Sequence, residues 1–438
     1  MWSFRTRFRV YLLPIVAIVL VQIQTSQFWS FNKRLLSEGT IDTALSIIDQ
    51  PHQAVKMSSL SDDSDFPPLP ILPQNQTFGA CLMVKGDNDL LSEWIPYHYT
   101  LLPLRYLLVV TDVGNSESPE SVLKKWTSTQ TGLHWWVKNV SEIENLHGEF
   151  QAEQVEYQFQ KRHGGTESNV TLDSKTIQYV AHSHLIHKQR AMITYCTKFM
   201  KQRGVRWVSM YDTDEFLAIN RIGMAEQNEL RNKTSTFESL GETYGMRPQL
   251  PPIESNATVV EIIDSFERTR QPLKSCHTMP RVSFGAMENF TCPGSEDIKA
   301  FAKETFDFNR LGTLRYQQHA IKTDFSKNRF GKVFIDVSNI SDYTLSIPPK
   351  NIHRPYADEC IRPIVPVQEA PFYLMHYAGG WERFKSKNDR RRGFEQWKEL
   401  ADVSDSTSCC QEEVYRWLPR FVDQVGIKRA KVLLSHKQ

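Results

Sequence analysis

A strand, a helix and a second strand follow one another at the start of the first well-patterned part of the chain. Residues 79–84 form a short apolar run, residues 90–102 carry apolar side chains at helical spacing, and residues 106–112 form a second apolar run. Within about 35 residues, this order indicates a βαβ unit, because parallel strands need a crossover of this kind, and the crossover is right-handed. The sequence therefore predicts an α/β fold with a mostly parallel sheet flanked by helices.

The same alternation recurs in the middle of the chain. A helical pattern from about Ser183 to Arg203 leads into an apolar run that ends at Asp212. Residues 140–180 and 220–260 are polar with few apolar repeats, and we expect long insertions or mobile loops there. Further along the chain the patterns predict two short strands and two helices, at residues 333–337, 371–375, 381–400 and 412–425.

An Asp-x-Asp sequence closes the predicted strand at Asp212. A short apolar run, formed by Trp207, Val208, Met210 and Tyr211, ends abruptly in Asp212-Thr213-Asp214. Two carboxylates there would supply hard oxygen ligands for Mg²⁺ or Mn²⁺, which keep positions free for phosphate oxygens and water. A second copy at residues 63–65 lies in a polar, proline-rich stretch, and we interpret it as linker. The alternative for Asp212 is a strand-end turn with Asp as a helix cap.

The charge balance argues against nucleic-acid binding. The 438 residues include 52 basic and 50 acidic side chains, a net charge of +2, whereas a nucleic-acid footprint needs a basic excess on one face. With 40% hydrophobic residues, the chain can bury a sizeable core.

The N-terminus has the pattern of a membrane signal. Three arginines precede an apolar run that begins at Val10, so the N-terminus is expected to stay cytoplasmic. The apolar run is short, which also fits a cleaved signal peptide, but no small-x-small cleavage site follows it. We favour a type II anchor in the Golgi membrane. The expected parts are a cytoplasmic tail (1–9), a signal-anchor helix (10–29), a stem (30–77) and a luminal domain (78–438).

Sequons and cysteines also indicate a luminal protein. About two or three Asn-x-Ser/Thr sequons are expected by chance, but the chain has seven, at Asn75, Asn139, Asn169, Asn232, Asn256, Asn289 and Asn339. Its seven cysteines could form up to three disulfides in an oxidising compartment. Cys276 and Cys292 are a candidate local pair, and the adjacent Cys409 and Cys410 should each have a distant partner.

Polar residues near the other predicted strand ends are candidates for binding a nucleotide. Lys85 follows the first strand, Glu93 lies in the helix behind it, and Asp112 ends the second strand. Alternatively, Asp112 simply opens a turn. Gln189 and Arg190 could reach phosphate or sugar, since Arg supplies a fixed fork of donors.

Two histidine-containing segments are candidates for further metal ligands. His182, His184 and His187 lie close together, but no flanking carboxylate completes a site, and a surface or capping role is favoured. His376 ends an apolar run before a Gly-Gly turn and could be a third metal ligand, with Lys387 facing a diphosphate. The alternative is a capped turn before an amphipathic helix.

Several segments together resemble family 92 glycosyltransferases and the related family 2-like group. The matching pieces run in order from about residue 78 to 390, and the most specific are DTDEF at residues 212–216 and the segment LMHYAGGWERFKSK at residues 374–387. One departure is Gly-Asp-Asn after Lys85, where the family usually has Asn-Glu.

The resemblance implies a GT-A fold, a nucleotide-sugar donor, a divalent cation and transfer with inversion to a glycan. It assigns Asp212 and Asp214 to the metal and diphosphate. It assigns Lys85, Glu93 and Asp112 to the nucleotide. The closing C-terminal segment would contribute His376 and Lys387.

The expected function is metal-dependent transfer of a hexose, with galactose the first candidate, from a UDP-sugar to a glycan or glycoprotein. Glu288 is the candidate base that deprotonates the acceptor hydroxyl, with Glu304 and Asp307 as alternatives. A second hypothesis is a non-catalytic luminal glycan-binding protein derived from a transferase. A hydrolase with paired carboxylates ranks last, since nothing in the sequence shows two carboxylates facing across a sugar.

Overall fold

The chain divides into two compact units, Met1–Asp63 and Ser64–Gln438, and every residue described here belongs to the second unit. The computed structural model describes residues 66–112, 115, 117–147, 174–220, 257–268, 275–286, 288, 291–319, 331–349, 352–353, 355–356, 359–360, 370–386, 394–401 and 413–435.

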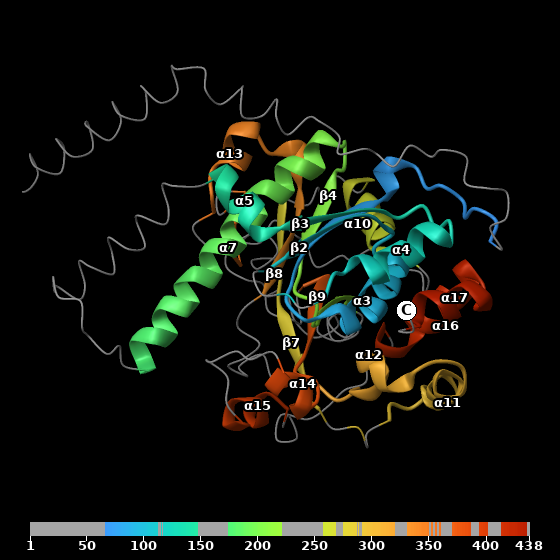
Figure 1. Ribbon diagram of the computed structural model, residues 1–438. Helices are drawn as coiled ribbons and strands as arrows, with labels where there is room; N and C mark the ends of the chain where they lie inside the picture. The colour runs from blue at the N-terminus through green and yellow to red at the C-terminus, as the bar shows by residue number, and fades with distance from the viewer. Residues whose placement is uncertain are drawn as a thin grey trace, which may run out of the picture. The chain divides into compact units, whose positions relative to one another are not determined.

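A six-stranded sheet forms the centre of this unit (Figure 1). Its order is β3-β2-β1-β4-β8-β6, and the strands β1, β2, β3 and β4 are mutually parallel. The strand β8 runs antiparallel to both of its neighbours. The bounds are β1 Phe78–Val84, β2 Leu104–Thr111, β3 His134–Asn139, β4 Trp207–Met210, β6 Cys276–Met279 and β8 Lys332–Asp336.

Helices cover both faces of the central sheet, which explains the continuous apolar runs of β1 and β2. Alternate residues of β1 point to opposite sides: Ala80 and Leu82 belong to one hydrophobic cluster and Cys81 to another. The first cluster packs under α3 (Asn88–Leu101) and α16 (Glu413–Val425), and the second under α7 (Ser174–Gln202). Figure 1 shows α7 and α3 on opposite sides of the sheet. The predicted α/β architecture with a parallel-rich sheet and the βαβ unit β1-α3-β2 are therefore confirmed.

A smaller sheet of three strands packs into the cluster beneath α3. Its order is β5-β9-β7, with β5 antiparallel and β7 parallel to β9. The strand β5 starts directly after the turn that ends β4, so the chain passes from the large sheet to the small sheet at Asp212-Thr213-Asp214. The bounds are β5 Glu215–Ile219, β7 Arg281–Phe284 and β9 Phe372–Tyr377.

The remaining elements surround these two sheets. Helix α17 packs against α3 and α4, α13 against α7, and α14 against α15. Their bounds are η1 Gln74–Gln76, α4 Glu120–Ser128, α5 Val140–His147, α10 Val259–Arg268, α11 Glu296–Thr305, η3 Phe308–Arg310, α12 Gly312–Arg315, η5 Val337–Asn339, α13 Asp342–Ser346, α14 Trp381–Ser386, α15 Phe394–Ala401 and α17 Ile427–Leu434.

Several predicted boundaries need correction. Residues 140–147 form α5 rather than a loop, because Val140 and Ile143 are buried in the cluster beneath α7. Helix α7 begins at Ser174, earlier than predicted. The single helix predicted at residues 381–400 is two, α14 and α15.

The expected disulfide between Cys276 and Cys292 is wrong. Cys276 pairs with Cys360, and Cys81 of β1 pairs with Cys196 of α7. The reason is the side of the sheet that each residue faces: Cys276 and Cys360 lie in the cluster beneath α7, whereas Cys292 lies in the cluster beneath α3. Cys292 is also disulfide-bonded.

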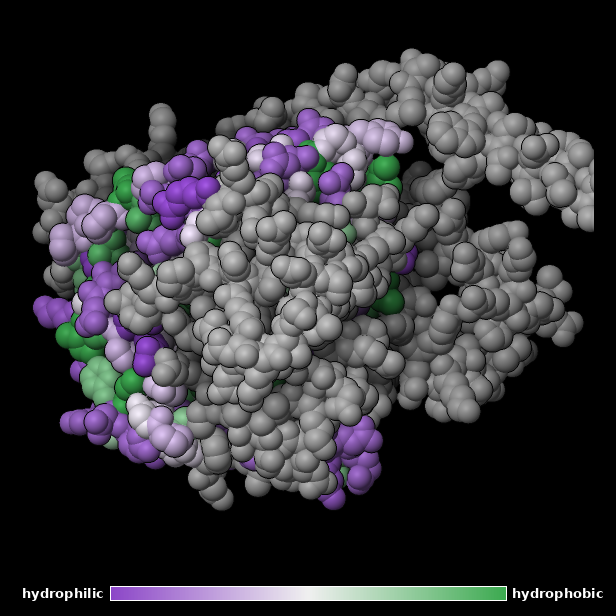
Figure 2. All heavy atoms as spheres, turned by 180° about the vertical axis from the view of Figure 1, so that it is seen from behind, coloured by the Kyte–Doolittle hydropathy of each residue, from purple (hydrophilic) through white to green (hydrophobic). Residues whose placement is uncertain are grey.

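The predicted tail, anchor and most of the stem, residues 1–65, lie outside the described residues. None of the helices that are described is both long and apolar enough to cross a membrane. The opposite face in Figure 2 mixes hydrophilic and hydrophobic side chains over its coloured part. Of the large apolar side chains that are most exposed in the described part, Tyr343 and Ile347 lie in and directly after α13, and the others lie on separate segments: Ile71, Phe394 and Ile427.

Candidate active site

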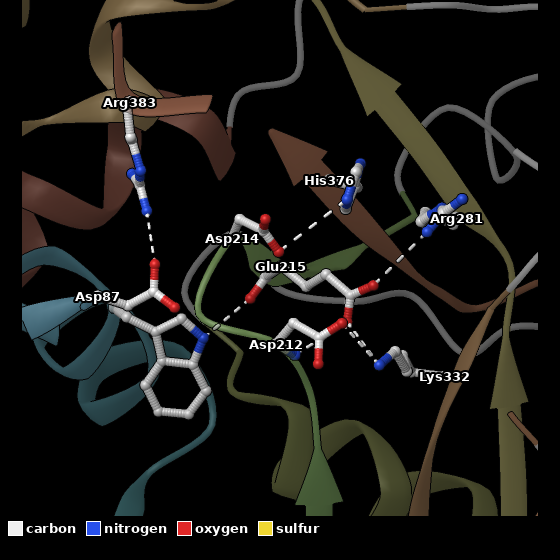
Figure 3. Close-up of polar contacts among 9 residues, drawn as sticks. Asp87, Asp212, Asp214, Glu215, Arg281, Lys332, His376 and Arg383 are labelled. Carbon is white, nitrogen blue, oxygen red and sulfur yellow. Dashed lines mark hydrogen bonds and ion pairs between the residues drawn. The ribbon is translucent and has the colours of Figure 1, made fainter. Parts of the chain in front are cut away.

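The Asp212-Thr213-Asp214 turn lies where the order of the central sheet reverses. The chain runs outward from β1 to β2 and β3, and then returns to place β4 on the other side of β1. The carboxyl ends of β1 and β4 therefore flank a topological switch point, where open α/β sheets bind ligands. Asp87 follows β1 and Asp212 follows β4, so both carboxylates lie at this edge (Figure 3).

The side chain of Glu215 closes the turn. Its Oε2 accepts a hydrogen bond from the Asp212 backbone N–H at 3.0 Å, while the Glu215 N–H donates to the Asp212 carbonyl at 3.0 Å. The Glu215 carbonyl accepts from Trp94 Nε1 at 2.9 Å, which fastens the turn to α3. These bonds hold the backbone of Asp212 in one conformation.

Two cations balance the carboxylates of the turn. Lys332 Nζ lies 2.9 Å from Asp212 Oδ2 and 3.7 Å from Glu215 Oε2, and Arg281 Nη1 lies 3.8 Å from Glu215 Oε1. The Glu215 side chain is fully buried, and that of Lys332 is 9% exposed. A buried charge is tolerated only when it is paired, so these four side chains form one electrostatic unit (Figure 3).

Burial and pairing shift the pKa values of this unit in different directions. Burial raises the pKa of Glu215 to about 7, although the Lys332 ammonium opposes the rise. Desolvation by the surrounding protein also acts to raise the pKa of the partly exposed Asp212, but the adjacent Lys332 outweighs it, and the pKa falls below its usual value. Burial acts to lower the pKa of Lys332, and the carboxylates of Asp212 and Glu215 more than offset this, so its pKa is raised. Asp212 and Lys332 are therefore an ionised pair at neutral pH.

Strand β9 holds the other end of the turn. The Tyr377 N–H donates to the Asp214 carbonyl at 2.9 Å, and His376 lies opposite Glu215 in the β5-β9 pair. His376 Nε2 is 4.0 Å from Asp214 Oδ1. The structure thus brings together the three residues that the sequence proposed as metal ligands: Asp212, Asp214 and His376.

Asp87 and Arg383 connect this edge to the C-terminal segment. Arg383 Nη2 of α14 lies 3.4 Å from Asp87 Oδ1, and the Asp87 side chain is 11% exposed. The sequence pointed to Lys85 at this strand end, but Lys85 is exposed, and it is Asp87 that Figure 3 shows beside the turn. The signal for Asp87 was its place after a buried strand, the same argument that singled out Asp212.

Glu93 has a structural role that the sequence did not reveal. Its carboxylate accepts hydrogen bonds from Gly312 N at 2.7 Å, Thr313 N at 2.9 Å and Thr313 Oγ1 at 2.6 Å. It therefore caps the N-terminus of α12. Burial raises the pKa of Glu93 to about 7, against the effect of the bonds from Thr313. These bonds use its acceptor oxygens within the protein, which weakens the expected nucleotide role.

The other nucleotide candidates lie at the end of β2 and on α7. Asp112 Oδ1 is paired with Lys188 Nζ at 2.6 Å, and Gln189 and Arg190, which follow Lys188 on α7, are partly buried. Lys387 and the side chains of His182 and His184 lie outside the described residues.

Glu288, the candidate base, borders the C-terminal segment. Its carboxylate is 51% exposed and forms an ion pair with Arg315, and the Tyr316 hydroxyl donates to it at 3.4 Å. The Tyr316 hydroxyl also lies close to Gly380, in the loop that follows His376 and Tyr377. Of the alternatives, Asp307 is paired with Arg310 at 3.1 Å, and Glu304 is exposed on α11.

The carboxylates of the turn fit a cation that takes most of its ligands from water and a bound substrate. Among the residues described, no group of three or more His, Cys, Asp or Glu side chains is arranged to hold a metal ion. Asp212 and Asp214 nevertheless present two carboxylates on one turn, and the Asp212 side chain is 46% exposed. Mg²⁺ in particular is commonly bound by one or two carboxylates together with water and substrate phosphates.

Sequence reasoning missed the groups that come from other elements. Lys332 is one polar residue at the start of an apolar strand, and Arg281 opens a strand of four residues. Arg383 lies in α14, four residues before Lys387, the residue of this segment that the sequence analysis had selected. Comparison of the chain with models of known protein families found no match. A search of curated proteins found no similar sequence.

Proposed function

We propose that this protein is a metal-dependent glycosyltransferase with a GT-A type fold, which moves a hexose from a UDP-sugar to a glycan or glycoprotein. The observation that carries the proposal is the place of Asp212 and Asp214 at the switch point of the sheet. Carboxylates at the carboxyl edge of a parallel sheet are positioned to meet the diphosphate of a nucleotide.

The residues in and around the turn have different roles in stabilising the leaving group. Asp212 and Asp214 would hold the cation, which when bound neutralises charge that develops on the departing diphosphate. Glu215 fixes the backbone of the turn, so the carboxylates need no reorganisation when the donor arrives. Lys332 and Arg281 keep this acidic turn close to electrical balance before the donor binds.

Acceptor activation is assigned to Glu288. Its half-exposed carboxylate can accept a proton from a sugar hydroxyl, and Tyr316 places it beside the loop after β9. Inversion of the anomeric carbon, galactose as the sugar, and a Golgi location with an N-terminal anchor rest on the sequence and its resemblance.

The proposal is tested by nucleotide release. Purified full-length protein is incubated with a panel of UDP- and GDP-hexoses and glycan acceptors, with and without Mn²⁺. We expect release with one donor that depends on the cation and is lost in Asp214→Asn. The matched control is Asp342→Asn, the same change at a carboxylate that is 86% exposed on α13, which should retain full activity.

One observation favours the second hypothesis, a non-catalytic glycan-binding protein. Asp212 is already neutralised by Lys332 at 2.9 Å, so the turn is stable without a cation. If glycan arrays show specific binding while no donor in the panel is consumed by the folded protein, this hypothesis replaces the first.

A further inference from the structure

We infer that Lys332 is a built-in counter-cation of the Asp212 turn, which weakens the binding of free divalent cations and favours their binding together with a nucleoside diphosphate. The inference rests on the proposed function and adds the order in which its ligands bind. It assigns a positioning role to a residue that the sequence did not single out.

The register of the sheet puts Lys332 beside Asp212. Val333 of β8 pairs with Met210, the last residue of β4, so Lys332 lies level with the residues that follow that strand. Its ammonium is 2.9 Å from Asp212 Oδ2, within the range of a charge-assisted hydrogen bond. The side chain is 9% exposed and is therefore held against the turn rather than free in solvent.

Charge makes Lys332 a competitor for any cation at this turn. When all groups are ionised, Asp212, Asp214 and Glu215 contribute three negative charges, and Lys332 and Arg281 contribute two positive charges, which leaves −1. Without Lys332 the same unit carries −2. A divalent cation that approaches Asp212 alone therefore meets a nearby ammonium and only one unbalanced negative charge.

A diphosphate removes this obstacle. It brings negative charge for both the cation and Lys332, so the ammonium can exchange Asp212 for a phosphate oxygen without losing its ionic partner. The turn should keep its shape during the exchange, because two bonds that hold it do not involve Lys332: Asp212 N donates to Glu215 Oε2 at 3.0 Å, and Tyr377 N donates to the Asp214 carbonyl at 2.9 Å. Before the exchange, Lys332 Nζ also lies 3.7 Å from Glu215 Oε2, a second carboxylate partner on the same turn. Cation and nucleotide should consequently bind as one unit.

The test measures Mn²⁺ binding rather than turnover. Paramagnetic resonance of free Mn²⁺ reports its affinity for the full-length protein, with and without UDP, once a protein-free titration of Mn²⁺ with UDP has corrected for chelation by the nucleotide. We expect wild-type protein to bind Mn²⁺ at least about tenfold more tightly when UDP is present. In Lys332→Gln, Mn²⁺ binding without UDP should be at least about tenfold tighter than in wild type, because Gln keeps a donor for Asp212 Oδ2 but removes the charge.

The matched control is Lys201→Gln. Lys201 of α7 is paired with Asp342 of α13 at 2.8 Å, whereas the ion pairs of the Asp212 turn described above are formed by other residues, so this variant should bind Mn²⁺ as wild type does. Thermal melting establishes that each variant is folded. The comparison of Mn²⁺ affinity with and without UDP uses wild-type protein and does not depend on the folding of any variant.

The outcomes separate the inference from the proposed function. Equal affinity of wild-type protein for Mn²⁺ with and without UDP would overturn the role of Lys332 while leaving a transferase intact. That role is likewise overturned if folded Lys332→Gln binds Mn²⁺ no more tightly than wild type. Absence of UDP binding under every condition would instead overturn the proposed function, and the inference with it.

Discussion

Acid should destabilise this protein through two histidines that are buried in neutral form. His277 lies on β6 between the two sheets, 1% exposed, with its ring stacked on Phe334 at a centroid distance of 4.9 Å. Neither ring nitrogen has a hydrogen-bond partner within the described part of the chain. Burial lowers the pKa of His277 from 6.5 to about 3.

The sign and size of the effect follow from proton linkage. Below pH 6.5 the unfolded chain binds a proton at His277 that the folded protein excludes, so stability is complete above that pH and falls as the pH drops toward 3. Between pH 8 and pH 5 this costs about 2 kcal/mol of unfolding free energy. His98 has a similarly lowered pKa of about 3 and adds about 2 kcal/mol more.

The assay is urea unfolding of wild-type protein and His277→Leu at pH 8 and pH 5. Other titrating groups affect both proteins alike, so the difference between the two pH-dependent losses isolates His277. We expect the loss of stability on acidification to be about 2 kcal/mol smaller in His277→Leu. Equal losses in both proteins would refute the claim that this ring is buried and neutral in the folded state.

Three further changes test the fold and the site. Glu93→Leu should lower the unfolding free energy by about 3 kcal/mol in urea titrations, because it leaves three donors of Gly312 and Thr313 without their acceptor; a change near zero would contradict the capping role. Replacing both Cys81 and Cys196 with Ala should cost about 4 kcal/mol in the same assay, since the bridge spans 115 residues; unchanged stability would argue against this pairing. Asp214→Asn should reduce cation-dependent nucleotide release at least about a hundredfold, measured with saturating donor, and a variant as active as wild type would exclude Asp214 as a ligand.

The central βαβ unit was predictable because its signals are local. Apolar runs bounded by turn residues mark β1 and β2, and the helical spacing between them marks α3. The missed strands lack such signals. β3 is only partly buried along its length, and β6 and β7 have four residues each, too few to show a period.

The candidate site likewise contains residues that local sequence predicts and residues that only the tertiary structure brings together. Asp212 and Asp214 were predictable because an apolar strand stops abruptly at two carboxylates. Lys332 is 120 residues from Asp212 in the sequence, and Arg383 is 296 residues from Asp87, so only the register of the strands and the packing of α14 bring these pairs together. Glu93 is the opposite case, a residue that the sequence selected but the structure uses differently. Its position in a helix behind the first strand suggested a nucleotide ligand, and only the packing of α12 against it shows that it is a helix cap.

The most direct test of the proposed transferase activity is nucleotide release by the full-length protein, with Mn²⁺ and a panel of UDP- and GDP-hexoses, compared with Asp214→Asn. We expect release from one donor that requires Mn²⁺ and disappears in the variant. Folded protein that releases no nucleotide from any donor, with glycan acceptors present, would contradict the proposal.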